Sequence, residues 1–259
     1  MLLSDRVCVV AGVGPGLGRE VALALAGHGA TVVMGARTAS FLEQVAGEIT
    51  ADGGTARVVP TNVVDPAQCD RLVAAADQEF GRVDALVDCA YRPDVFQTFE
   101  DVDLDKWRKL LEVNLFGALQ LAKAALVPMK RQGGGSIVFV SSMVTRRPLP
   151  LQAGYAVSKG ALNTAARALA VELGGYGIRV NTVVPGWMWG PNVELYVRTT
   201  AEGRGVDEQV VIDEIAANIP LGRIPSDDDV AGAAVYLVSD LSGGVTGQSI
   251  DVNGGEFFV

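Results

Sequence analysis

The chain has 259 residues, of which 49% are hydrophobic and 31 are glycine, so its length and composition suit one large α/β domain with an extensive core. Its formal net charge of −9 repels phosphate backbones and argues against nucleic acid as a partner. The only histidine is His28, which excludes both a Ser-His-Asp triad and a His-rich metal site, and no metal is expected.

The cysteines and the amino terminus indicate the compartment. Cys8, Cys69 and Cys89 are odd in number and form no CxxC motif, as is typical of reduced thiols in the cytoplasm. The first residues lack the order of a secretion signal, and no apolar run approaches the roughly 18–20 residues that span a bilayer. We therefore expect a cytoplasmic protein with no membrane partner.

Short apolar runs alternate with longer helical patterns along the whole chain. The predicted strands are Val7–Ala11, Thr31–Gly35, Ala56–Pro60, Val83–Asp88, Ser136–Val140, Ile178–Val183 and Ser249–Val252. The predicted helices are Gly16–Gly29, Ala39–Ala51, Pro66–Phe80, Leu104–Met129, Tyr155–Gly174 and Asp227–Val238. Because the strands are apolar throughout, they predict a parallel sheet covered on both faces. The fold expected is a single Rossmann-like α/β domain, residues 1–259, with a doubly wound seven-stranded sheet.

A glycine-rich turn follows the first predicted strand. Its spacing does not fit G-x-G-x-x-G but does fit G-x-x-x-G-x-G through Gly12, Gly16 and Gly18. Glycines at such positions let backbone N–H groups approach a pyrophosphate at the positive end of a helix. The place of this turn between a strand and a helix predicts a dinucleotide site.

The end of the second strand bears on the choice of dinucleotide. An acidic residue there accepts hydrogen bonds from a free ribose 2′-hydroxyl, whereas a basic one pairs with a 2′-phosphate. This chain has Ala36 followed by Arg37, which favours NADP(H) over NAD(H). The alternative is that Arg37 stacks on adenine or faces solvent.

Tyr155 and Lys159 are the predicted acid/base pair. Their i, i+4 spacing puts both side chains on one helical face. Lowering a tyrosine pKa from ~10 by about three units requires roughly 4 kcal/mol. One positive charge ~4 Å away supplies about that much at an effective dielectric near 20.

Two further polar positions accompany this pair. Ser141 and Ser142 directly follow the predicted strand Ser136–Val140 and place a hydroxyl at the mouth of the expected cleft. Asn114 lies inside an otherwise apolar helix, where a buried amide needs partners. Asn114 is either part of the catalytic site, or it makes a structural hydrogen bond that stabilises a bend in the helix.

The segment 187–218 interrupts the alternation of strands and helices. Its glycines and prolines predict a lid over the cleft, with a surface insertion as the alternative. Several large apolar side chains there and in other loops either line a pocket for a bulky or cyclic substrate or pack the segment onto the body: Trp187, Trp189, Tyr196, Phe96, Met143 and Leu149.

Taken in order, these motifs resemble the short-chain dehydrogenase/reductase family over nearly the whole chain. The resemblance also includes Pro185-Gly186 after the sixth strand and Asp251–Gly255 near the end. It implies that Tyr155 is the acid/base, that Ser142 binds the substrate oxygen, that Lys159 holds the nicotinamide ribose and that Asn114 positions a water in a proton relay. The implied cofactor-binding residues are Gly12, Gly14, Gly16, Leu17, Gly18, Arg37, Thr38, Asn62, Val63, Ala90, Tyr155, Lys159, Pro185, Gly186 and Met188.

The chain departs from the family pattern at three places. Asp88-Cys89-Ala90-Tyr91 replaces the usual Asn-Asn-Ala-Gly, so that a tyrosine stands where glycine is usual. Asn62 replaces an aspartate that contacts adenine. Gly190 replaces a threonine that contacts the carboxamide, so that contact is lost or is made by backbone.

The expected function is hydride transfer between a nicotinamide cofactor and a secondary alcohol or ketone. An alternative of another class is a nucleotide-binding protein that senses redox state without turnover. An epimerase or dehydratase is disfavoured because few residues follow Gly255 to form a substrate domain. The broad apolar surfaces of the helices Leu104–Met129 and Tyr155–Gly174, and the family's habit of pairing through them, predict a homotetramer, with a monomer as the alternative.

Overall fold

A computed structural model describes residues 1–258 and contains one seven-stranded parallel sheet in the order β3-β2-β1-β4-β5-β6-β7. The order reverses between β1 and β4, which makes the sheet doubly wound. The predicted fold class is confirmed. The strands are β1 (Val7–Ala11), β2 (Thr31–Ala36), β3 (Thr55–Pro60), β4 (Ala85–Asp88), β5 (Gly135–Val140), β6 (Ile178–Pro185) and β7 (Ser249–Val252).

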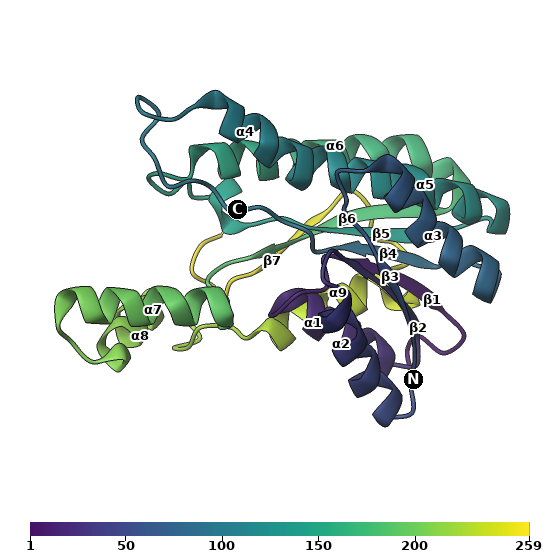
Figure 1. Cartoon of the computed structure of the whole chain (residues 1–259), viewed down its shortest axis with the longest axis horizontal. Helices are drawn as coiled ribbons and strands as arrows, with labels where there is room; N and C mark the ends of the chain where they lie inside the picture. The colour runs from purple at the N-terminus through teal and green to yellow at the C-terminus, as the bar shows by residue number, and fades with distance from the viewer. Residues whose placement is uncertain (259) are drawn as a thin grey trace.

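Helices cover both faces of this sheet (Figure 1). One face packs against α1 (Leu17–Gly27), α2 (Ala39–Ala51) and α9 (Asp227–Val238). The other packs against α3 (Pro66–Phe80), α5 (Ala118–Gln132) and α6 (Ala153–Leu173). Apolar side chains fill both layers and largely bury β1, β2, β4, β5 and β6, as the unbroken apolar runs predict, whereas the edge strand β3 leaves Thr55, Arg57 and Pro60 exposed. Short 3₁₀ turns complete the connections: η2 (Met143–Thr145), η3 (Gly174–Tyr176) and η4 (Asp240–Ser242).

The predicted single helix over 104–129 is divided in the structure. It consists of α4 (Leu104–Leu111), the π-helical turn η1 (Glu112–Gly117) and α5. A hydrophobic period near 3.6 residues does not distinguish an α-helix from one that contains a π-turn, so the sequence could not predict this irregularity. The combined helix Leu104–Gln132 is, contrary to our expectation, long and apolar enough to cross a membrane by composition. Its apolar face instead covers the sheet through Leu121, Ala125 and Met129.

The segment 187–218 is also more regular than predicted. It contains α7 (Pro191–Arg204) and α8 (Glu208–Ala216), which project from the carboxyl ends of the strands (Figure 1). The two helices share a small apolar cluster of their own, built around Val197, Val211 and Ile215. Trp189 packs against that cluster. The segment is therefore a folded unit that stands next to the carboxyl edge of the sheet.

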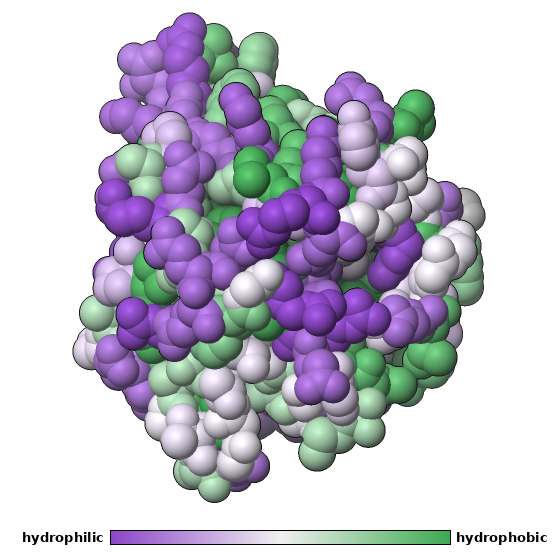
Figure 2. Space-filling model, turned by 90° about the vertical axis from the view of Figure 1, so that its right-hand side faces the viewer, coloured by the Kyte–Doolittle hydropathy of each residue, from purple (hydrophilic) through white to green (hydrophobic). Residues whose placement is uncertain are grey.

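At the opposite end of the molecule, the buried carboxylate of Asp84 links the amino ends of β1 and β4. The Asp84 carboxylate accepts a hydrogen bond from the backbone N–H of Val7 at 2.8 Å and pairs with Arg82 at 2.6 Å and Arg6 at 3.3 Å. Its side chain is only 5% exposed. Figure 2 views the molecule from this side and shows hydrophilic side chains gathered across the middle of the face.

Replacing Asp84 with alanine should lower the free energy of unfolding by about 3 kcal/mol, because the buried Val7 N–H loses its acceptor and two arginines lose their partner. Urea denaturation measures this directly. The control is Asp240→Ala, which removes an 88% exposed partner of Arg6 and should change stability by no more than about 0.5 kcal/mol. Equal effects of the two substitutions would contradict this account of Asp84.

Candidate functional site

A cleft of about 920 Å³ opens at the carboxyl ends of the strands. It is lined by the glycine turn, the ends of β2, β3, β4, β5 and β6, the start of α6 and the first turn of α7. Every residue proposed from the sequence to bind cofactor contributes to this lining, and so do Ser142, Tyr155 and Lys159. Of the proposed site residues, Asn114 alone is not part of the wall.

The glycines of the turn have different physical roles. A Cβ on Gly12 would lie 2.3 Å from the backbone nitrogen of Ala90, and one on Gly18 would lie 2.2 Å from the carbonyl oxygen of Gly12. These two glycines are therefore required by the packing of the protein itself. At Gly14 a Cβ would meet nothing within 4 Å, so the space beside it belongs to the cleft.

Gly16 starts α1 with φ 98°, a left-handed conformation that favours glycine, and no side chain caps the helix there. The first N–H groups of α1 thus face the cleft with the positive end of the helix behind them. An open, uncapped helix start of this kind fits a pyrophosphate.

The residues that follow β2 and β3 line the part of the cleft where the adenosine ribose of a dinucleotide is expected. Arg37 is exposed there and follows Ala36 directly, with Thr38 as the N-cap residue of α2. Asn62 follows β3 and uses its side-chain oxygen to accept a hydrogen bond from Val64 N–H at 3.3 Å. The side chain of Asn62 thus stabilises its own loop while it faces the cleft.

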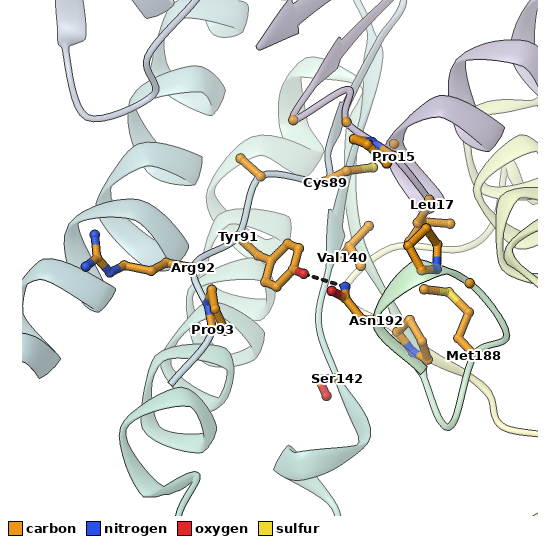
Figure 3. Close-up of a pocket in the computed structure, with 18 of the residues that line it drawn as sticks. Pro15, Leu17, Cys89, Tyr91, Arg92, Pro93, Val140, Ser142, Met188 and Asn192 are labelled. Carbon is orange, nitrogen blue, oxygen red and sulfur yellow. Dashed lines mark hydrogen bonds between the residues drawn. The ribbon is translucent and has the colours of Figure 1, made fainter. Parts of the chain in front are cut away.

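The predicted acid/base residues Tyr155 and Lys159 lie at the end of β5. The ammonium group of Lys159 donates to the carbonyl oxygen of Val140 at 2.7 Å, and its Nζ lies 5.8 Å from the centre of the Tyr155 ring. Two residues after Val140, the Ser142 hydroxyl faces the Tyr155 phenol closely enough to lower its pKa by hydrogen bonding. Ser142 is marked in the cleft in Figure 3. The neighbouring Ser141 is buried, and its hydroxyl has no partner within residues 1–258.

Burial dominates the protonation of these groups. Burial raises the pKa of the Tyr155 phenol above its ordinary value, and this outweighs the lowering by Ser142. Burial also lowers the pKa of Lys159 to about 8, which the nearby Asp88 carboxylate partly opposes. The charge of Lys159 therefore does not by itself lower the pKa of Tyr155, although we expected this from the sequence. The charge of Lys159 is partly offset by Asp88, and the desolvation of the phenol was not visible in the sequence.

Asp88 is the buried carboxyl that offsets Lys159. It ends β4 and accepts a hydrogen bond from Ala90 N–H at 3.1 Å. Burial raises its pKa to about 6, with Lys159 acting in the opposite direction. Lys159, which lines the cleft, and Asp88 are thus an ammonium and a carboxyl that are each only 2% exposed.

Asn114 makes three hydrogen bonds from its place in the π-turn η1. Its side-chain oxygen accepts from Arg92 N–H at 2.6 Å, and its amide donates to the Arg92 carbonyl at 3.0 Å and to Ser158 Oγ at 3.1 Å. It is fully buried. These bonds fasten the loop after β4 to α6 one residue before Lys159, which fits the structural role weighed for Asn114 from the sequence.

Tyr91 reaches across the cleft. Its hydroxyl accepts a hydrogen bond of 2.6 Å from the side-chain amide of Asn192, which lies in the first turn of α7 (Figure 3). Tyr91 stands where the family usually has glycine, and its side chain therefore connects the loop after β4 with the segment 187–218. The sequence marked Tyr91 as unusual but gave no sign of its partner.

Asp227 is a site residue that the sequence analysis missed. It is buried at the start of α9 and lines the cleft beside the glycine turn. A Cβ on Gly190 would lie 2.7 Å from its Oδ1, so the glycine that replaces threonine makes room for this carboxyl. Within residues 1–258 its Oδ1 has no hydrogen-bond partner. Burial raises its pKa to about 6, and the nearby carboxylates of Glu20, Asp228 and Glu194 add to that effect.

The large apolar residues proposed for the pocket divide into three groups. Trp187, Met143 and Leu149 line the cleft, and Tyr196 lies against Trp187 with ring centres 5.2 Å apart. Trp189 packs against the apolar cluster of α7 and α8. Phe96 is 58% exposed and does not line the cleft, so its proposed place there was wrong.

Ionisable side chains in the described part of the chain form no group of three or more suited to a metal ion. The cleft instead combines an anion-binding helix start, a bulky apolar wall and a phenol beside a buried amine. Such a set suits the binding of a dinucleotide and the movement of one proton at an oxygen atom.

Three comparisons agree with this geometry. A family model described as enoyl-(acyl carrier protein) reductase matches residues 12–256. The chain is 38% identical over 255 residues to an uncharacterized oxidoreductase of Methylorubrum extorquens, with 98% of both chains covered. It is 36% identical over 265 residues to an L-rhamnose 1-dehydrogenase (NAD(P)(+)) of Azotobacter vinelandii, covering 99% of this chain and 98% of the relative. The solved structure of a short-chain type dehydrogenase/reductase from Mycobacterium ulcerans superposes with a TM-score of 0.90 at 31% identity, covering 99% of this chain and 91% of that one.

Asp227→Asn should stabilise the protein at pH 8 and change little at pH 4. The pKa of this carboxyl is about 6 in the fold against an ordinary 3.8, so the folded chain holds the proton more tightly than the unfolded chain. Stability is therefore lost as pH rises from about 4 through 6, and the loss reaches up to about 3 kcal/mol above that range. Denaturation at both pH values measures the difference.

The matched control is Asp228→Asn, which changes the exposed neighbour in the same helical turn. We expect little effect from it at either pH. A gain from Asp227→Asn that is equal at pH 4 and pH 8 would show that the carboxyl is not the cause.

Proposed function

The chain belongs to the short-chain dehydrogenase/reductase family and is an NAD(P)-dependent oxidoreductase; from that premise we propose that it exchanges a hydride between NADP(H) and a bulky secondary alcohol or ketone, with Tyr155 as the acid/base. The observation that carries the proposal is the meeting of Tyr155, Ser142 and Lys159 at the end of β5, in the same cleft as the uncapped start of α1. A protein that only sensed the cofactor would not need this set.

The chain's own residues have separable roles in the reaction. A bound nicotinamide cofactor would supply or accept the hydride. Tyr155 gives its proton to the carbonyl oxygen during reduction and takes the proton from the hydroxyl during oxidation. Ser142 donates a hydrogen bond to the same oxygen atom, and the positive charge of Lys159 favours a phenolate that burial by itself disfavours. Asn114 holds the loop after β4 against α6 and so keeps Lys159 in place.

The preference for NADP(H) is supported by the rim beyond β2. Arg37 supplies a positive charge where the adenosine ribose is expected, and Ala36 offers no carboxylate to a free 2′-hydroxyl. The name of the Azotobacter relative, L-rhamnose 1-dehydrogenase (NAD(P)(+)), gives either cofactor for that protein, so the preference proposed here rests on Ala36 and Arg37 of this chain. We assign Thr38, Asn62 and Val63 to the adenosine end, and Ala90, Pro185, Gly186 and Met188 to the nicotinamide end.

The segment 187–218 is assigned the role of a substrate lid. Trp187, Met143 and Leu149 give the adjoining wall enough apolar surface for a bulky or cyclic substrate. The hydrogen bond between Tyr91 and Asn192 joins this lid to the body and favours a closed position.

We also propose that the protein is a cytoplasmic homotetramer. The three cysteines are free and buried, as suits a reducing compartment. Val127 on α5 and Val171 on α6 are 70% and 85% exposed, which suits the burial of these helices against further copies.

Replacing Tyr155 with phenylalanine should reduce turnover of ketones and alcohols at least ~1,000-fold, because the variant lacks the hydroxyl that moves the proton. Binding of NADPH, measured by fluorescence titration, should change less than about threefold. Wild-type rates in the variant would disprove the acid/base assignment. Absence of turnover in the wild type with a broad carbonyl and alcohol panel, despite cofactor binding, would favour the redox-sensing alternative.

Replacing Arg37 with aspartate should weaken NADPH binding at least ~30-fold and leave NADH binding nearly unchanged or improved. The reason is that the substitution removes the partner of the 2′-phosphate and adds an acceptor for a free 2′-hydroxyl. Titration of both cofactors provides the measurement. Equal changes in the two affinities would remove the basis for the NADP(H) assignment.

A further inference from the structure

A second chamber of about 250 Å³ adjoins the catalytic cleft on the side of the lid. The two cavities share Met143, Leu149 and Trp187, so a molecule seated at Tyr155 has a direct continuation into this space. In contrast to the apolar wall of the cleft, the chamber carries charged side chains: Arg147, Arg204, Glu214 and Glu256.

Glu256 is the most unusual of these charged groups. It follows the left-handed glycines Gly254 and Gly255, at φ 64° and 88°, which turn the chain after β7. Its side chain is only 5% exposed. Its Oε2 lies 3.6 Å from the position of a Cβ on Gly186, so the carboxyl stands beside the backbone that follows β6.

The carboxylate of Glu256 lacks hydrogen bonds. Within residues 1–258 its buried Oε2 has no partner. Its Oε1 lies 3.7 Å from a guanidinium nitrogen of Arg147, which is too long for a hydrogen bond, and Arg147 is itself 65% exposed. Burial raises the pKa of this carboxyl, with Arg147 opposing. A buried acceptor of this kind is satisfied when a ligand brings a donor to it.

The charges of the chamber balance. Arg204 forms two hydrogen bonds with Glu214, at 2.6 and 2.7 Å, and Arg147 is the counter-ion of Glu256. Two positive and two negative groups leave no net charge to select an ionic ligand. Carboxylate acceptors and guanidinium donors together suit hydroxyl groups, which both donate and accept.

We propose that Glu256 is a specificity-determining residue whose carboxylate accepts a hydrogen bond from a hydroxyl that the substrate carries beyond its reacting carbon. The preferred substrate is then an uncharged alcohol or ketone with at least one further hydroxyl group, its carbon skeleton against Trp187 and its distal hydroxyl in the chamber. This inference rests on the proposed function and adds the substrate class to it.

The test uses matched pairs of substrates with the intact protein and oxidised cofactor. One set is cyclohexanol with cyclohexane-1,2-, 1,3- and 1,4-diol, and another is pentan-2-ol with the pentitols. In the wild type, kcat/KM for the best diol or polyol should exceed that of its mono-alcohol at least ~10-fold. Glu256→Met should remove this preference mainly through KM, while activity on the mono-alcohols and binding of the cofactor are retained. Glu256→Gln, which keeps an acceptor, should fall between the two.

Glu202→Leu is the control, because it removes an exposed carboxylate of α7 that does not line the chamber. Its selectivity should equal that of the wild type. The inference is wrong if a broader carbonyl and alcohol panel gives turnover but hydroxylated members have no advantage, or if Glu256→Met keeps the wild-type ratio. A preference for 4-aminocyclohexanol over the diols would equally overturn the choice of an uncharged substrate. Absence of any turnover in the wild type would instead contradict the proposed function.

Discussion

The hydrogen bond from the Lys159 ammonium to the Val140 carbonyl is the interaction on which the site depends. It joins α6 to the end of β5 at 2.7 Å, and the lysine that donates it is only 2% exposed. Because Tyr155 lies one helical turn before Lys159 and Ser142 two residues after Val140, this single contact brings the phenol and the hydroxyl together. A buried charge is costly without partners, so the arrangement is retained only because the strand end supplies a carbonyl and β4 supplies the Asp88 carboxyl.

Two buried carboxyl groups offset the positive charge of the basic residues in and near the cleft. Asp88 is a buried carboxyl close enough to Lys159 to affect its pKa, and Asp227 lines the cleft beside the start of α1. Burial raises the pKa of both carboxyls to about 6. Each is linked to a departure from the family pattern, since Asp88 stands at a usual asparagine and Asp227 fills the space left by Gly190. The departures therefore add carboxyl groups near the cleft, while Ser142, Tyr155 and Lys159 still line it.

Much of the fold was predictable because its signals are local. The strands are apolar and β-branched, and their observed bounds differ from the predicted ones by at most two residues. The glycine turn was found from its spacing and its place between a strand and a helix, and Tyr155 and Lys159 were found from their spacing, the polar residues around them and the family resemblance. Contacts between distant segments were not accessible in this way: the bond between Tyr91 and Asn192 joins residues 101 positions apart. For the same reason the sequence missed Asp227, and it gave the wrong direction for the pKa of Tyr155, because spacing does not reveal desolvation.

The central claim is that one cleft brings a dinucleotide and the phenol of Tyr155 to the same substrate oxygen. A crystal structure of the protein with NADP(H) tests it most directly. The account predicts the pyrophosphate at the start of α1, the ribose hydroxyls at Lys159 and the reactive ring carbon opposite Tyr155 and Ser142. A dinucleotide bound elsewhere, or bound in the cleft with its nicotinamide ring away from Tyr155, would contradict it.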